Sequence, residues 1–137
     1  MSATPPPPTL PWFDYDYAVV RLVPRVYLGT FHNVGVVMHA RTAGFLEARL
    51  HIDRDRLAAC CPTLDVDVST RYLNAYQRIC QGARGAGPIA LLPPSERFLW
   101  LTMTRSAVLQ TSHVHAGRTH NLHHTLERLF QQHVDGA

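Results

Sequence analysis

The sequence predicts a single α+β domain, with an antiparallel sheet of about four strands and about three main helices packed mostly on one face. Two observations support this fold class. Segments rich in β-branched residues follow one another before residue 52, as expected for a β-meander. Helical apolar spacing then dominates the second half of the chain. A chain of 137 residues buries about two thirds of its unfolded surface, so it can fold without a disulfide or a metal.

The sheet is expected to begin with residues 15–23, which are apolar on both faces from Tyr17 onward and therefore suit a central strand. Residues 34–39 form the second expected strand. In the third, residues 45–51, apolar and polar side chains alternate, which is typical of an antiparallel strand with one solvated face. Residues 107–112 are the fourth expected strand.

Four helices are expected, of which the last three are the main ones. Asp53 suits the N-cap of a short first helix. The second covers residues 65–81, with a core-facing stripe formed by Tyr72, Leu73, Tyr76, Ile79 and Cys80. Ser95 is expected to cap the third, which ends at Leu101. The last, residues 121–134, should bury Leu122, Leu126, Leu129, Phe130 and Val134.

Residues 1–13 are predicted to be a disordered, proline-rich leader in front of a single domain, residues 14–137. Four consecutive prolines exclude helix and sheet and favour an extended polyproline conformation. The chain shows neither a secretory signal pattern nor an apolar run near 18 residues. We therefore expect a cytoplasmic protein without a membrane segment.

Charge and cysteine content argue against several classes of function. The thirteen basic residues, all arginine, exceed the ten acidic ones and are scattered, so nucleic-acid binding is not expected. The chain has an odd number of cysteines, Cys60, Cys61 and Cys80, and they show no CxxC spacing. Neither a disulfide framework nor a zinc site is therefore predicted. Cys60 and Cys61 close the first helix without a paired-histidine pattern, so they are not predicted nucleophiles. No cofactor is expected.

Several segments in order resemble the bacterial domain of unknown function 3037 family: YDYAVVRLVPRV, FHNVGVVMH, GFLEARLHID, LPPSERFLWLT, RSAVLQTSHVHAG and LERLF. The resemblance runs from about Tyr15 to Val134 and brings no established activity. Members of this family are often encoded beside a HipA-like kinase, which implies such a kinase as partner. Thr30 stands where relatives commonly carry an acid, so the resemblance implies no role for a carboxylate here.

Arg21 interrupts the first apolar strand, and a buried guanidinium must be paired and hydrogen-bonded. One interpretation is a structural ion pair with Glu47 or Glu96. The other is an anion site, shared with Arg97 or Arg105, for phosphate or carboxylate.

Asn33 stands at the entry to the second strand, where hydrogen bonds to backbone favour a structural role. If the fourth strand continues, His113 and His115 lie on one face and could offer two metal ligands. The spacing selects no third ligand from His39, Glu47 or His120. Solvated or hydrogen-bonded histidines are therefore favoured over a metal site, with an acid/base or ligand-binding role for His115 as the remaining alternative.

Two functions are consistent with these residues. The first is a non-catalytic adaptor or regulatory partner of another cytoplasmic protein such as a HipA-like kinase, which predicts an unusually large exposed apolar or arginine-rich patch. The second is a small enzyme, or a nucleotide- or phosphate-binding domain, in which Arg21, Arg97, Arg105 and His115 converge on one pocket. The absence of a catalytic motif favours the first. The candidate anion- or partner-binding residues are Arg21, Asn33, Arg97, Arg105, Gln110 and His115.

Overall fold

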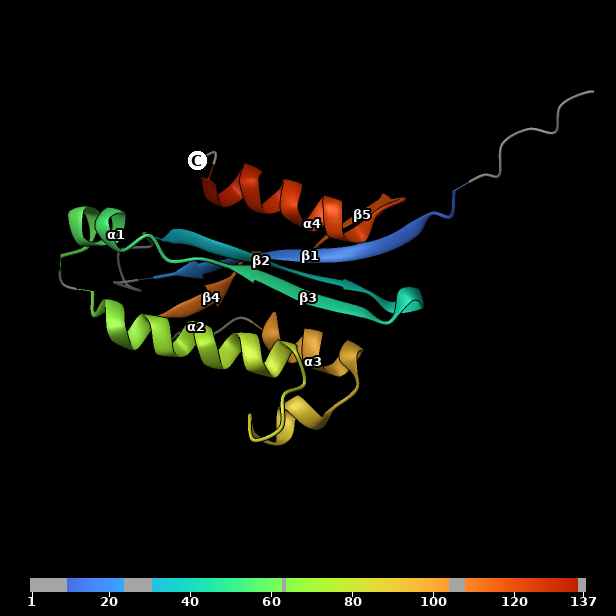
Figure 1. The fold of residues 1–137 in the computed structure, drawn as a ribbon, viewed down its shortest axis with the longest axis horizontal. Helices are drawn as coiled ribbons and strands as arrows, with labels where there is room; N and C mark the ends of the chain where they lie inside the picture. Colours follow the sequence, from blue (N-terminus) through green and yellow to red (C-terminus); the bar gives the residue numbers. More distant parts are fainter. Residues whose placement is uncertain (1–9, 24–30, 63, 104–107, 136–137) are drawn as a thin grey trace, which may run out of the picture.

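A five-stranded antiparallel sheet lies between two helical layers in the computed structural model, which describes residues 10–23, 31–62, 64–103 and 108–135. Figure 1 shows α2 and α3 on one face of the sheet and α4 on the other. The α+β class predicted from the sequence is confirmed. None of the helices in these ranges is long and apolar enough to cross a membrane.

The strands are β1 (Phe13–Leu22), β2 (His32–Ala40), β3 (Phe45–Leu50), β4 (Leu109–Thr111) and β5 (His115–Thr119). The first three form the predicted β-meander, in the order β3-β2-β1. On the other side of β1, β4 pairs with its C-terminal half and β5 with its N-terminal half. The strand β5 was not predicted from the sequence.

Ser112 lies in the short segment between β4 and β5, and its hydrogen bonds hold this segment against β1. Its backbone N–H donates to the carbonyl of Val19 (2.8 Å), and its Oγ accepts from the N–H of Val19 (2.8 Å). Two residues of β1 face three residues, Ser112–Val114, at this point. The fourth strand therefore does not continue through His113, as would be needed to align His113 with His115.

The helices are α1 (Arg54–Cys60), α2 (Val66–Cys80), α3 (Pro94–Leu101) and α4 (Leu122–Phe130), and a π-helical turn, Gln131–Asp135, extends α4. The predicted N-cap of α1 is confirmed, because Asp53 accepts from the N–H group of Arg56. Asp65, which was not predicted as a cap, accepts from the N–H group of Val68 at the start of α2. Ser95 does not cap α3, because the cap position is occupied by Pro93. The Ser95 hydroxyl instead lies 3.3 Å from His39 Nε2.

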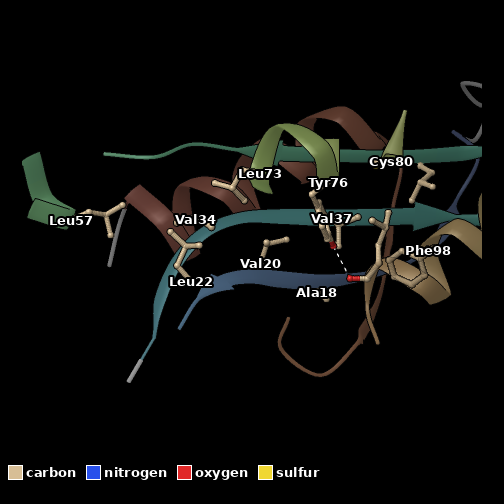
Figure 2. Close-up of a cluster of buried hydrophobic side chains, with 12 residues drawn as sticks. Ala18, Val20, Leu22, Val34, Val37, Leu57, Leu73, Tyr76, Cys80 and Phe98 are labelled. Atoms are coloured by element: carbon tan, nitrogen blue, oxygen red, sulfur yellow. Dashed lines mark hydrogen bonds between the residues drawn. The ribbon is translucent and has the colours of Figure 1, made fainter. Parts of the chain in front are cut away.

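Two apolar cores separate the layers because successive residues of β1 point to opposite faces. One core joins Ala18, Val20 and Leu22 to α2 and α3, and Figure 2 shows its side chains. Within it the Tyr76 hydroxyl donates to the carbonyl of Leu101 (2.9 Å), which links α2 to the end of α3.

The second core lies under α4, whose five predicted apolar residues are all buried. Leu122, Leu126 and Leu129 pack against Tyr15, Val36, Met38 and Ala40 of the sheet. On α2, however, Tyr72 is 52% exposed, so its expected place in the core is wrong.

Candidate functional site

Three of the predicted site residues lie in one cross-strand row. Arg21 on β1 is opposite Asn33 on β2 and Gln110 on β4. The alignment depends on an extra residue, Val34, because Val20 pairs with Gly35 while Arg21 pairs with Asn33. A bulge of one residue changes which side chains share a face. Asn33 is thereby turned toward α4, where its Nδ2 donates to the carbonyl of His133 (2.9 Å).

His115 joins this row through Tyr17. The two residues pair across β1 and β5, with ring centroids 5.3 Å apart. The Tyr17 ring also lies 6.0 Å from the ring of His133, in the turn after α4. Tyr17 and Arg21 are four residues apart on β1 and share the α4 face. We call Tyr17, Arg21, Asn33, His115 and His133 the polar cluster.

The polar cluster contains three basic side chains and is partly withdrawn from water. Burial lowers the pKa of Arg21 below its ordinary value. Burial is also the main cause of a lowered pKa at His133, and the charges of His115 and Arg21 lower it further. The flat guanidinium of Arg21 lies over the ring of Phe31, 4.1 Å from its centroid. His133 was not among the predicted site residues, because it is distant in sequence from the rest of the cluster and only the fold brings it there.

Neither expected ion pair of Arg21 is found within the described ranges. Glu47 instead contacts Nδ1 of His123 at 3.3 Å, and the side chain of Glu96 on α3 is exposed. The arginines also fail to converge. Arg97 lies in the α2 and α3 layer, where its Nη1 donates to the carbonyl of Leu92 (2.7 Å), so the sheet separates it from Arg21. Arg105 lies outside the described residues, as does Thr30.

The histidine pair expected on one strand is not formed, because His113 lies in the break before β5 and is exposed. In the part of the chain that the structure describes, no group of three or more His, Cys, Asp or Glu side chains could hold a metal ion.

Cys61 has a histidine neighbour that the sequence did not indicate. Its Sγ lies 3.0 Å from Nε2 of His32, although the two residues are 29 positions apart. Cys61 caps the C-terminal end of α1 and is buried. His32 lines a cleft of about 190 Å³ that also involves Phe31, Asn33, Asp53, Arg56 and Val134. The cleft therefore borders both the Cys61–His32 pair and the polar cluster.

An apolar groove lies on the opposite helical layer, where α2 and the end of α3 meet β4 at the edge of the sheet. Its volume is about 300 Å³, and its walls include Tyr72, Tyr76, Ile79, Leu101, Met103 and Leu109. Tyr72 and Met103 are 52% and 51% exposed at its rim. Leu99 and Trp100 on the adjoining helix α3 are exposed as well.

Comparison with known proteins places the chain in a family. No curated protein and no solved structure shows significant similarity to it. Residues 17–134 match the family model described as "Protein of unknown function (DUF3037)". This match covers both helical layers, the polar cluster and the apolar groove. The chain therefore belongs to the DUF3037 family.

Proposed function

We propose that the protein is a non-catalytic binding module that holds a partner protein in the apolar groove. The observation that carries this proposal is the gathering of exposed apolar side chains around the groove, with Tyr72 and Met103 at its rim. Large apolar surfaces are costly to leave in water, and contiguous ones commonly mark interaction sites. Aromatic residues and methionine are also enriched in protein interfaces.

The position of the groove suits a peptide-like partner. β4 is at the end of the strand order β3-β2-β1-β4, so the groove runs beside a sheet edge. A partner segment can add backbone hydrogen bonds at such an edge while its apolar side chains enter the groove. The family resemblance suggests a HipA-like kinase from the same cytoplasm as the partner.

The test is native mass spectrometry of the tagged full chain, purified gently from its own host. We expect a stoichiometric complex with the kinase for the wild-type protein. The double variant Tyr72→Asp/Met103→Asp should weaken binding to the purified kinase at least about tenfold, because each added carboxylate must be desolvated at the interface.

Val114→Asp is the matched control, since Val114 is similarly exposed, at 47%, but does not line the groove. This variant should bind the kinase as the wild type does. A wild-type chain that elutes alone, or groove variants that keep full affinity, would contradict the proposal.

A further inference from the structure

Five buried side-chain polar atoms lack a hydrogen-bond partner among the described residues, and three of them occur together in the polar cluster: Nε of Arg21, Oδ1 of Asn33 and Nε2 of His133. Arg21 and Asn33 are paired across the strands, and Asn33 is hydrogen-bonded to the backbone of His133. Buried polar atoms are nearly always satisfied in folded proteins, so three exceptions at one place indicate a missing binding partner.

The charges of the cluster are also unbalanced. Arg21, His115 and His133 repel one another when protonated, and none of them forms an ion pair with a carboxylate among the described residues. Withdrawing the Arg21 guanidinium from water without a counter-charge is unfavourable. An anion in the cluster would remove this cost.

A cleft beside the cluster offers space for a small ligand. Cζ of Arg21 lies over the Phe31 ring, 4.1 Å from its centroid, and the guanidinium N–H groups can make in-plane hydrogen bonds to a ligand. Of the residues around the cluster, Phe31 and Asn33 line the neighbouring cleft of about 190 Å³, whereas Arg21 and His133 do not. Arg56 adds a cation to this cleft, and Asp53 adds a carboxylate at its α1 wall.

The unsatisfied atoms distinguish between anions. Nε of Arg21 is a donor, Nε2 of His133 is a donor in the tautomer that carries its proton there, and Oδ1 of Asn33 is an acceptor. A carboxylate or a sulfate has acceptors alone and leaves Asn33 unsatisfied. A phosphate monoester that retains one proton offers acceptors for Arg21 and His133 and a P–OH donor for Asn33.

We propose that Arg21, Asn33 and His133 form a binding site for a phosphate monoester group, bound with one proton on the phosphate. The site goes beyond the proposed function, because it lies on the α4 face of the sheet and the apolar groove lies on the other. The two can therefore be tested separately.

The experiment is a titration of the full chain, ¹⁵N-labelled at histidine, with methyl phosphate, a phosphate monoester, or with sulfate at pH 6.0 and pH 8.0. Methyl phosphate should bind saturably at pH 6.0 and at least tenfold more tightly than sulfate. The side-chain signals of His133 and His115 should shift, while those of the exposed His124 should not. Affinity should fall at pH 8.0, where the monoester has lost its second proton and no longer offers a P–OH donor to Asn33.

Arg21→Gln should reduce phosphate affinity at least tenfold. Arg118→Gln is its control, because Arg118 is an exposed β5 residue whose partner is Asp14, and it should bind as the wild type does. If Arg21→Gln fails to fold, His133→Gln replaces it, with the same expected loss. The proposed site would be overturned by equal affinity for sulfate, by unshifted His133 signals, or by wild-type affinity in both cluster variants. Ordered water would then be the occupant of the cluster. Tyr72→Asp/Met103→Asp should leave phosphate binding unchanged.

Discussion

The two buried cysteines that the structure describes have different surroundings, and their reactivity should differ accordingly. Cys80 faces the core between α2 and the sheet, and it is 1% exposed. Burial raises the pKa of its thiol to about 12, against a smaller opposing effect of Arg97. Cys61 lies at the end of α1, with an imidazole nitrogen of His32 at 3.0 Å that can take up its proton. The thiolate is the reactive form of cysteine.

We therefore predict that iodoacetamide labels Cys61 in the native protein well before Cys80. At pH 8, a thiol with a pKa of about 12 is thiolate in about one molecule in ten thousand, so the rates should differ at least about a hundredfold. Peptide mass spectrometry in a Cys60→Ser background measures both rates. His32→Gln should slow the labelling of Cys61 and leave Cys80 unaffected. Similar rates for both thiols in the native protein would show that His32 does not activate Cys61.

At the same scale, the sequence could nominate site residues but could not show which of them meet. Arg21 stood out because a charged residue interrupts an apolar strand. Its row with Asn33 depends on the bulge at Val34, and a shift of one residue leaves no reliable signal in the sequence. The approach of Cys61 to His32 depends on how α1 docks beside β2, which local patterns do not specify.

Among the elements, those with a strong apolar period were predicted, whereas β5, which has none, was missed. β1, β2 and β3 show β-branched or alternating patterns, and α2 and α4 show helical stripes. The segment of β5 reads HAGRT, with neither pattern, and its residues are exposed or half-buried. Its strand conformation comes from hydrogen-bonded pairing with β1, a tertiary contact. Tyr72 has the sequence spacing of the apolar stripe on α2, but it lies at the edge of that stripe, where the groove begins.

The close packing of β2 against β3 requires a glycine at position 35. A Cβ at this position would overlap Cδ2 of Leu50 and lie 2.5 Å from the backbone carbonyl oxygen of Arg49, which cannot move without disturbing β3. Gly35→Ala should therefore lower the free energy of unfolding by about 1–3 kcal/mol, as overpacked cores do. Urea denaturation followed by circular dichroism measures the change.

Gly44 provides the contrast, because its turn has open space within 4 Å but a φ of +60°. Asparagine tolerates that conformation, so Gly44→Asn should change stability by less than about 0.5 kcal/mol. If Gly35→Ala were as mild as Gly44→Asn, β3 would have to move away from β2 more easily than its backbone pairing suggests.

For the whole molecule, the sheet separates two surfaces with different chemistry. The apolar groove adjoins the core under α2 and α3, whereas the polar cluster adjoins the core under α4. Substitutions at well-separated sites with no shared partner usually have additive effects. Under the two proposals, a protein binds on one face of the sheet and a phosphate group on the other. Any coupling between the two sites would pass through β1, because β1 pairs directly with β2, β4 and β5.

Acid should lower the free energy of unfolding, because each face of the sheet contains a histidine whose pKa is lowered by burial. His39 is buried against Phe98, with ring centroids 5.1 Å apart, and burial lowers its pKa in opposition to the charge of Asp16. The pKa of His133 is lowered as well. Below about pH 6.5 the unfolded chain therefore binds protons that the folded chain excludes. The free energy of unfolding should fall as the pH drops from 6.5 toward the lowered pKa values, and it should be insensitive to these histidines above pH 7.5.

Urea denaturation at pH 5.0, 6.0 and 7.5 measures this dependence. His39 can contribute a slope of at most about 1.4 kcal/mol per pH unit. His39→Gln should flatten the profile between pH 5.0 and 6.5, and adding His133→Gln should flatten it further, whereas the exposed His124 provides a control whose replacement by glutamine leaves the slope unchanged. A wild-type profile that is already flat in this window would mean that both imidazoles take up protons in the folded state as readily as in the unfolded chain. Their burial would then have no effect on stability.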